Sequence, residues 1–432
     1  MEQRGRMAAL WAAVLGWLFD GLEMGLFPLI AGPALTELVG PDKAAQDAWK
    51  GAIYAGFLVG AAGGGLLFGW LADRIGRIKA LSWSILCYAL CSGLSAGVTE
   101  AWQLMLLRTL ASLGMGGEWA VGLALVREVF PRGRAAFLAA MIGCAANVGI
   151  LLMALLGWWM GHEAGALALK LEPLFGTDAV RFLFGADGSG WRMLFLLGAL
   201  PALITFFIRR HVPESARWED ARRSSAPPRI REIFAPHQRS HTLAATGLGA
   251  VALIGMWCSV QWVPSWVNSA YALADPAARH AARSLAYVWC AVGFTLGSFA
   301  APFVAERMGR RASFVLLTLG SVASTAWLFR TDPHDSASLH GLCLLTGTFS
   351  AGFFGWLPLA LPELWPTRLR ATGQGFAFNA GRILAAAGTL LSGTLSTAFD
   401  HDLGRMAAVM SLVYLVGLPL ASVVRPAADL PE

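Results

Sequence analysis

Two carboxylates stand close together in the first apolar stretch of the chain. In the segment WLFDGLEMG, Asp20 and Glu23 are three residues apart, which would place both on one side of a helix. Charged groups at membrane depth are costly and usually line a cavity or pair with another charge. We interpret them, together with Glu118, as candidate proton acceptors; the alternative is a structural pair satisfied by another helix. All eight histidines fall in loops or at helix ends, so carboxylates would have to carry any coupled protons.

Two arginines also lie inside apolar stretches. Arg382 follows Asn379 by three positions in GFAFNAGRILAAAG, and no acid in that stretch neutralises it. Its partner must therefore come from another helix, from an anionic substrate, or from both. Arg108 lies ten positions before Glu118. It would either bind a substrate carboxylate through bidentate hydrogen bonds or serve as counter-ion for one of the acids. We predict Arg382 as the main anion-binding residue.

Tryptophans and prolines inside two later apolar stretches suggest further substrate contacts. Pro264 interrupts MWCSVQWVPSWV, and Pro358 lies in AGFFGWLPLALPE. A proline in a spanning helix frees a carbonyl and allows bending, which suits a gate. The remaining candidate substrate contacts are Arg108, Trp257, Gln261, Trp262, Trp356 and Asn379.

The composition is that of a membrane protein. Of 432 residues, 56% are hydrophobic and only 14% are charged, against about a quarter charged in soluble proteins. The net charge of +6 is better explained by arginines meeting anionic lipid than by nucleic acid. The six cysteines all fall in apolar runs, with no spacing suited to a metal, and no Walker A pattern occurs. We expect no metal, no cofactor and no enzymatic activity.

Twelve apolar runs are long enough to cross a bilayer, which takes about 20 residues each. The sequence therefore predicts an all-α membrane protein with two six-helix bundles. The first run continues past Asp20 without an obvious cleavage site, so we interpret it as a spanning helix and not as a signal peptide. The runs are approximately 8–31, 49–72, 78–98, 101–126, 135–160, 191–209, 242–269, 283–305, 312–329, 340–363, 371–397 and 404–424.

The distribution of lysine and arginine orients the predicted bundle. Most of the 33 lie on the side that holds both termini, so we expect cytoplasmic termini. The longest cytoplasmic connection divides the chain into an N-terminal bundle (1–210), a linker (211–241) and a C-terminal bundle (242–432). The other long connection, about 161–190, is predicted as an extracellular loop of mixed charge.

The two halves repeat each other. AERMGRR, which contains Glu306, echoes ADRIGRI, which contains Asp73, at an offset of 233 positions. PELWPTRLRA echoes REVFPRGRA at 235, so that Glu363 matches Glu128. Two echoes at nearly one offset indicate a duplicated six-helix unit, hence a transporter with its site between the halves.

The charged turns in these repeats are predicted to act as a lock. Asp73 would accept from free N–H groups at the start of the eleventh helix and pair with Arg127, and Glu306 would act likewise in the other half. Anchoring by positive charge alone would explain the arginines but not the recurring acid and glycine. The predicted gating residues are Asp73, Arg74, Gly76, Arg77, Arg127, Glu306, Arg307, Gly309 and Arg310.

The segment GWLADRIGRIKAL resembles the signature between the second and third helices of the major facilitator superfamily, and RTLASLGMGG resembles its second motif. WLFDGLEMGLFPL, GMGGEWAVGLALVREVFPRGRA, WRMLFLLGALPALITFFIRRHVPESARWE and LPELWPTRLRATGQGFAFNAGRI resemble the proton symporters of sialic acid and short monocarboxylates, with aromatic acid transporters similar at the same places. The resemblance implies twelve helices, alternating access and import of an organic anion with protons. Those symporters commonly carry two aspartates in the first helix; here the second is Glu23.

We therefore expect a bacterial-type inner-membrane secondary transporter that acts as a monomer and moves a small organic acid anion with protons. Its partners would be that anion, protons and lipid, with no nucleic acid. Arg382 and Arg108 would hold the anion while a carboxylate of the first or fourth helix takes the proton. Efflux of drugs or metabolites by proton antiport, uptake of a neutral sugar, and a sensor that binds without transport stay open as alternatives.

Overall fold

The computed structural model describes residues 3–129, 132–185, 189–200, 230–365 and 370–422. Within these ranges some helical side chains, including those of Asp73, Arg77 and Arg127, lie outside the described part. The described residues form helices and short connections, with no strand among them. Eight of the described helices are long and apolar enough to cross a membrane, or nine if one bent pair counts as a span.

The helices of the first half follow the predicted apolar runs. They are α1 (Gln3–Val39), α2 (Lys43–Ile75), α3 (Arg77–Leu94), η1 (Ser95–Gly97), α4 (Ala101–Val129), α5 (Arg132–Phe175), α6 (Thr177–Phe184) and α7 (Trp191–Leu197). The sixth run starts with α7, and most of the predicted linker lies outside the described residues.

The second half repeats the arrangement. Its elements are η2 (Ile230–Phe234), α10 (Arg239–Cys258), η3 (Val260–Trp262), α11 (Val263–Ala270), α12 (Pro276–Met308), α13 (Arg310–Leu328), α14 (Ser336–Ala360), η4 (Leu361–Leu364), α15 (Arg370–Ala398), α16 (Leu403–Ser411) and α17 (Val413–Ala421). The seventh run is built from α10, η3 and α11, and the twelfth from α16 and α17. The described helices agree with the predicted twelve-helix organisation, and the sixth run is described only as far as residue 200.

The connection predicted as a loop over 161–190 is largely helical, which corrects the sequence interpretation. Helix α5 continues to Phe175 with a bend of 83° between its parts 144–160 and 165–175, and α6 follows after Gly176. The reason is local: the segment GALALKLEPLF is rich in alanine and leucine, and its single lysine and glutamate are also good helix formers. Mixed charge in this segment marks a solvated helix, not a loop.

The break in the seventh run also lies earlier than Pro264. Helix α10 ends at Cys258, and Pro264 stands in the first turn of α11. Proline is tolerated there because a first-turn N–H has no partner within the helix in any case. Pro358, by contrast, stays inside the last turn of α14, which continues to Ala360.

Glycines let helices within each half approach closely. A Cβ added to Gly116 of α4 would lie 1.9 Å from the carbonyl oxygen of Ala61 of α2, and one added to Gly297 of α12 would lie 1.9 Å from that of Thr348 of α14. Close approach at Gly116 lets α4 pack directly against the backbone of α2. Gly76 and Gly309 occupy the same turn in the two halves, with φ of 109° and 85°, a backbone conformation that favours glycine.

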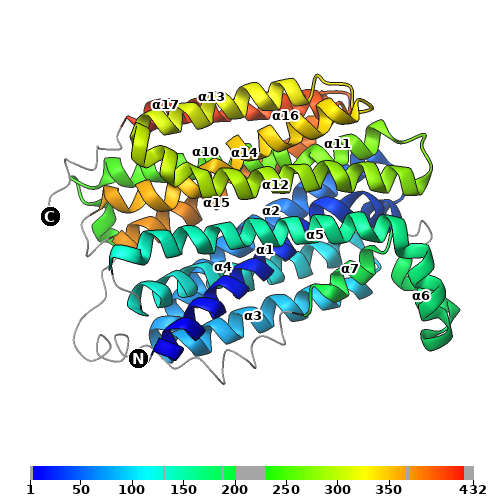
Figure 1. The fold of residues 1–432 in the computed structure, drawn as a ribbon, viewed down its shortest axis with the longest axis horizontal. Helices are drawn as coiled ribbons and strands as arrows, with labels where there is room; N and C mark the ends of the chain where they lie inside the picture. The colour runs from blue at the N-terminus through cyan, green and yellow to red at the C-terminus, as the bar shows by residue number, and fades with distance from the viewer. Residues whose placement is uncertain (1–2, 130–131, 186–188, 201–229, 366–369, 423–432) are drawn as a thin grey trace.

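The two halves lie side by side along the length of the bundle (Figure 1), with α12, α13, α14, α16 and α17 on one side and α1, α3, α4, α5 and α7 on the other. Helix α2 contacts α15 across the boundary between the halves, and α5 contacts α12 in the same way. Most of the buried apolar side chains belong to one continuous core that spans both halves. The boundary is nevertheless hollow at its middle.

Candidate functional site

A cavity of about 130 Å³ lies between the two halves, with walls from α1, α2, α4 and α5 on one side and from α10, η3, α14, η4 and α15 on the other. At roughly 10–15 Å³ for each water molecule, it has room for about ten waters, or an organic molecule of similar size. The wall is mostly apolar. The polar side chains that line it are Trp17, Asp20, Asn147, Trp257, Gln261, Gln374 and Arg382.

Arg382 reaches the cavity from α15 as its single described cation. Its Nη1 donates to the carbonyl oxygen of Ala61 at 3.2 Å and to Oδ1 of Asn379 at 3.3 Å, and the guanidinium lies over the ring of Phe378. Among the described residues it forms no ion pair, and Nε and Nη2 make no hydrogen bond. Those two atoms form the edge that grips a carboxylate with two parallel bonds. Asn379 is not part of the wall; it holds Arg382 in place.

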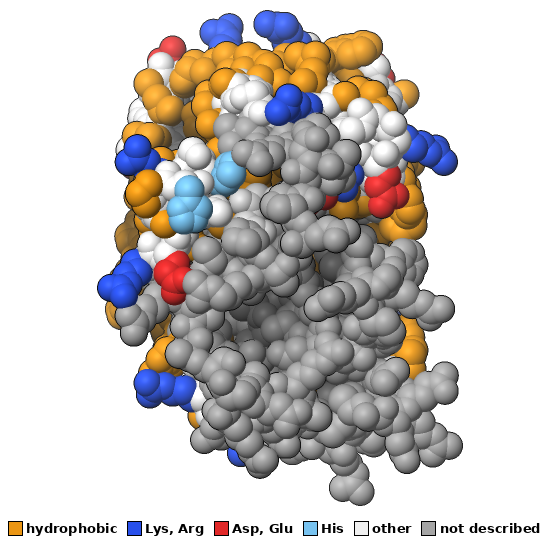
Figure 2. Space-filling view, turned by 90° about the vertical axis from the view of Figure 1, so that its left-hand side faces the viewer, with side chains coloured by type: hydrophobic (Ala, Val, Ile, Leu, Met, Phe, Trp, Pro, Cys, Tyr) orange, Lys and Arg blue, Asp and Glu red, His pale blue; other side chains and the backbone are white. Residues whose placement is uncertain are grey.

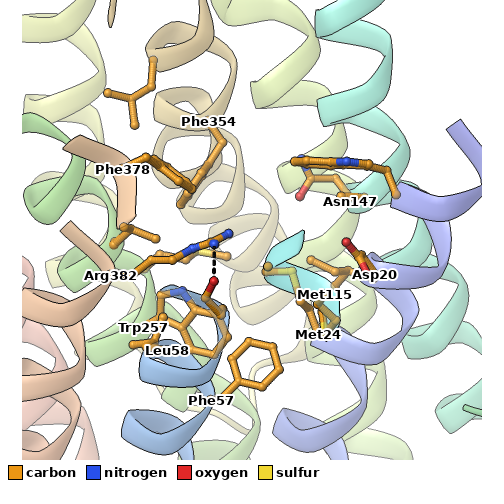
Figure 3. Close-up of a pocket in the computed structure, with 18 of the residues that line it drawn as sticks. Asp20, Met24, Phe57, Leu58, Met115, Asn147, Trp257, Phe354, Phe378 and Arg382 are labelled. Atoms are coloured by element: carbon orange, nitrogen blue, oxygen red, sulfur yellow. Dashed lines mark hydrogen bonds between the residues drawn. The ribbon is translucent and has the colours of Figure 1, made fainter. Parts of the chain in front are cut away.

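Asp20 faces Arg382 from the opposite wall, on α1 (Figure 3). The two groups attract each other across the cavity but are too far apart for an ion pair. Behind Asp20 lies Glu118 of α4, which interacts with it and packs against Gly16. Apart from the contact between these two carboxyl groups, Asp20 Oδ1 and both Glu118 oxygens have no hydrogen-bond partner within the described structure. Buried carboxyl oxygens in this condition are natural places to hold a proton.

Glu23 and Arg108 do not line this cavity, and this corrects the role predicted for Arg108. They form a buried ion pair, each side chain 1% exposed, and Nη2 of Arg108 also donates to the backbone oxygen of Glu23 at 3.2 Å. Ser92 donates to the same carboxylate at 2.8 Å. Arg108 instead lines a second, much smaller space behind Phe57. Of the two roles left open for Arg108, the structure therefore supports that of counter-ion.

The predicted tryptophan contacts divide in the same way. Trp257 and Gln261 line the cavity, whereas Trp262 and Trp356 are fully buried away from it. Trp356 donates from Nε1 to the backbone oxygen of Arg310 at 3.0 Å, so it joins α14 to α13. Both side chains therefore serve packing, a correction that follows from the side of the helix on which each stands.

Several residues that line the cavity were not predicted from the sequence. Phe57, Phe354 and Phe378 give the cavity aromatic surfaces (Figure 3), but nothing distinguishes them in a chain with 24 phenylalanines. Asn147 interrupts an apolar stretch, and Gln374 lies on the same helix as Asn379 and Arg382, so the sequence does carry a signal for both. Asn147 also donates to Oγ of Ser298 in the other half at 2.8 Å.

The charged turns are described only in part. The side chains of Asp73, Arg77 and Arg127 lie outside the described residues. Arg74 lies over the ring of Trp70, and the side chains of Glu306 and Arg307 are exposed. In the described part of the second half the turn is tied down by Arg310, whose Nη2 binds Oε1 of Glu363 at 2.9 Å. We find no ion pair of Glu306 among the described residues.

Comparison with known proteins agrees with this architecture. The family model described as "Major Facilitator Superfamily" matches residues 12–389. A probable 4-methylmuconolactone transporter of Cupriavidus pinatubonensis is 32% identical, covering 90% of this chain and 83% of its own length. The sialic acid transporter NanX of Escherichia coli is 26% identical, covering 90% and 87%.

Among solved structures, the xylose transporter XylE of E. coli in a partially occluded inward-open conformation aligns with a TM-score of 0.73 at 15% identity, covering 99% of this chain and all of that one. At that identity the likeness shows the fold alone. The family match spans most of the chain and rests on sequence. The chain therefore belongs to the Major Facilitator Superfamily and is a multi-pass membrane transporter, not an enzyme.

Proposed function

We propose that this transporter carries a small, planar organic acid anion together with a proton. The observation that carries the proposal is Arg382, a guanidinium in the central cavity with its carboxylate-binding edge unused among the described residues. Arginine prefers carboxylates because its planar fork matches their geometry. An uncharged sugar would leave the positive charge of Arg382 without a counter-charge, which weighs against sugar uptake.

Proton coupling follows from the charges of the cavity. With Glu118 protonated, the charges of Asp20 and Arg382 balance each other across the cavity before an anion binds. A bound anion takes up the positive charge of Arg382, and Asp20 is then left as an uncompensated buried carboxylate, which is costly. A proton on Asp20 restores neutrality. Anion and proton should therefore load together, and the neutral, loaded carrier should be the form that reorients.

The wall favours a flat, unsaturated solute of about one ring. Phe57, Trp257, Phe354 and Phe378 offer ring faces, while few polar side chains are available for a polyhydroxylated molecule. Two of the compared relatives are named for 4-methylmuconolactone and for sialic acid. The limited volume favours a solute closer in size to the first.

We place the protein in the cell (inner) membrane with both termini in the cytoplasm. Figure 2 views the end of the bundle that holds the start of α1 and the end of α17, and Lys and Arg side chains stand around it. Exposed residues of this kind at the turns and connections of that end are Arg74, Lys79, Arg231, Arg239, Arg307 and Arg311. This is the charge bias of a cytoplasmic face. Because one chain contains both halves of the cavity, a monomer should suffice.

The charged turns are proposed to close this cytoplasmic end when the carrier faces outward. The Arg310–Glu363 pair supports such a role in the second half, since it joins the turn after Gly309 to η4. Asp73, Arg77 and Arg127 would form the corresponding contacts of the first half. The division into bundles 1–210 and 242–432 joined by the linker 211–241 is part of the same proposal.

The proposal is tested with purified protein in liposomes. Uptake of benzoate, pyruvate, sialic acid and a neutral sugar is measured with and without an acidic exterior, for the wild type and for Asp20→Asn. We expect acid-stimulated uptake of benzoate above the others, and no stimulation in the variant. Three outcomes would refute the proposal. Uptake of the sugar but of no organic acid would favour a sugar transporter, and proton-driven efflux would favour an antiporter. Binding without transport would favour a sensor.

A further inference from the structure

The strongest feature that this function does not use is a set of side chains at the opposite end of the bundle, which in the orientation proposed above is extracellular. Asp47 and Lys50 stand three residues apart on α2, in the first half, and each binds a residue of the second half. We propose that Asp47 and His401 form a proton-sensitive latch that holds the two halves together at this end.

Asp47 is the centre of the latch. Its Oδ2 accepts from Oγ of Ser396 at 2.9 Å and lies 3.1 Å from Nδ1 of His401. Ser396 belongs to α15 and His401 to the turn that follows it, so both bonds cross from one half to the other. Three positions along α2, Lys50 hydrogen-bonds Ser265 of α11 and lies over the ring of Trp262, 4.2 Å from its centre. Asp47, which forms the latch, and Lys50 therefore both contact the second half from one side of α2.

The backbone at His401 is unusual in a way that serves this contact. Asp400 and His401 have φ of 52° and 59°, and they are the two non-glycine residues with positive φ in the described chain. Two consecutive residues in this left-handed region carry strain, which persists where the surrounding structure requires it. The N–H of His401 donates to the carbonyl oxygen of Ser396 at 2.7 Å. This turn presents the imidazole to Asp47.

Histidine makes the latch responsive to protons. Histidine is the side-chain type that changes charge between about pH 5 and pH 8. The His401 side chain is 33% exposed, so external protons can reach it. An imidazolium binds a carboxylate more strongly than a neutral imidazole does. External acid should therefore tighten the latch, and a more alkaline exterior should loosen it.

The neighbouring charges are compatible with this response. Asp47 attracts Lys50, which lies on the same helix, and Arg283 of α12 repels it. On the segment that carries His401, Asp400 precedes it, and Asp402 is paired at the surface with Arg405 at 3.0 Å. Asp47 is thus the carboxylate that the ring of His401 contacts in the described structure, and its protonation adds an opposite charge at that contact.

The test measures the distance between spin labels at Lys43 of α2 and Leu273 beyond α11, two exposed positions on opposite halves, in full-length protein whose native cysteines are replaced. Spectra are recorded at about pH 5.5 and about pH 8, on either side of the histidine range. Partly exposed ion pairs of this kind shift an equilibrium about 1.5-fold to fivefold, so acid should raise the closed-to-open ratio by that factor.

Two variants remove the response without relying on one substitution. His401→Asn keeps a residue that tolerates the left-handed backbone but does not titrate, and Asp47→Asn keeps the acceptor for Ser396 but not the charge. His334→Asn is the control, because His334 is exposed and its ring lies 4.5 Å from that of Tyr271, tilted by 41°, within one half. We expect both latch variants to lose a response that the control keeps. A full response in His401→Asn, or none in the wild type, would overturn the proposal.

Discussion

Replacing Arg382 by glutamine should weaken carboxylate binding while leaving the cavity in place. The side chain supplies the cavity's single described cation, and the substitution removes its charge and its two-pronged edge. Truncating one partner of a buried, hydrogen-bonded charge pair costs about 2–5 kcal/mol. At about 1.4 kcal/mol for each factor of ten, the dissociation constant should rise between about 30-fold and a few thousand-fold.

The assay is equilibrium binding of benzoate and of benzamide, its uncharged analogue, followed by quenching of tryptophan fluorescence. Trp17 and Trp257 line the cavity and would report occupancy directly. The wild type should prefer the acid, and Arg382→Gln should bind acid and amide alike. The matched control is Arg405→Gln, the same chemical change at a side chain that is 80% exposed. A thermal unfolding curve establishes that each variant is folded.

Two results would refute the reasoning. One is an Arg382→Gln protein that binds benzoate within threefold of the wild type, which would mean that the anion sits elsewhere. The other is an equal loss of benzoate and benzamide binding, which would mean that Arg382 shapes the cavity and does not discriminate between a charged and an uncharged ligand. The control variant must stay close to the wild type in both measurements.

Three further predictions concern the helices that frame the cavity. Asp20→Asn should retain anion exchange between equal pools but lose accumulation driven by an acidic exterior, as measured by counterflow and by gradient-driven uptake. Glu23→Gln should lower the free energy of unfolding by about 3–5 kcal/mol, because it leaves Arg108 buried without its partner. Gly64→Ala should destabilise by about 1–3 kcal/mol, since its Cβ would lie 1.8 Å from the carbonyl oxygen of Leu113, whereas the adjacent Gly63→Ala meets nothing within 4 Å.

Each of these has its own contradicting outcome. Proton-driven accumulation that survives in Asp20→Asn would move the coupling to another group. An unchanged unfolding curve for Glu23→Gln would mean that the buried guanidinium of Arg108 finds a second partner when the charge of Glu23 is removed. Equal stability of the two glycine variants would show that α2 and α4 can separate without cost.

The fold could be predicted because its signals are long and repeated. Each apolar run exceeds what a soluble helix needs, and the duplicated turns at Gly76 and Gly309 fix the relation of the halves. Charge inside an apolar run was also informative: Asp20 and Arg382 do line the cavity. Groups of this kind are tolerated at membrane depth only where a cavity or a partner receives them.

The partners of those charges could not be predicted. Positions three apart in a helix differ by about 60° around its axis, since each residue turns about 100°. That offset is enough to direct Asp20 into the cavity and Glu23 toward α4, where it meets Arg108. The spacing rule that placed both on one side was right but too coarse. The contacts of Asp47 with Ser396 and His401, about 350 positions later, had no local signal at all.

The pairing of Glu23 with Arg108 simplifies the electrostatics of transport. Because Glu23 and Arg108 neutralise each other, the charged groups at the cavity are Arg382 and Asp20, which faces it, with Glu118 behind Asp20. Because an anion on Arg382 removes the attraction that favours an ionised Asp20, anion and proton binding must strengthen each other, and by the same factor in both directions. Anion affinity should therefore rise as pH falls in the wild type and stay level in Asp20→Asn. If both proteins show the same dependence, the proton is held by a group outside this cavity wall.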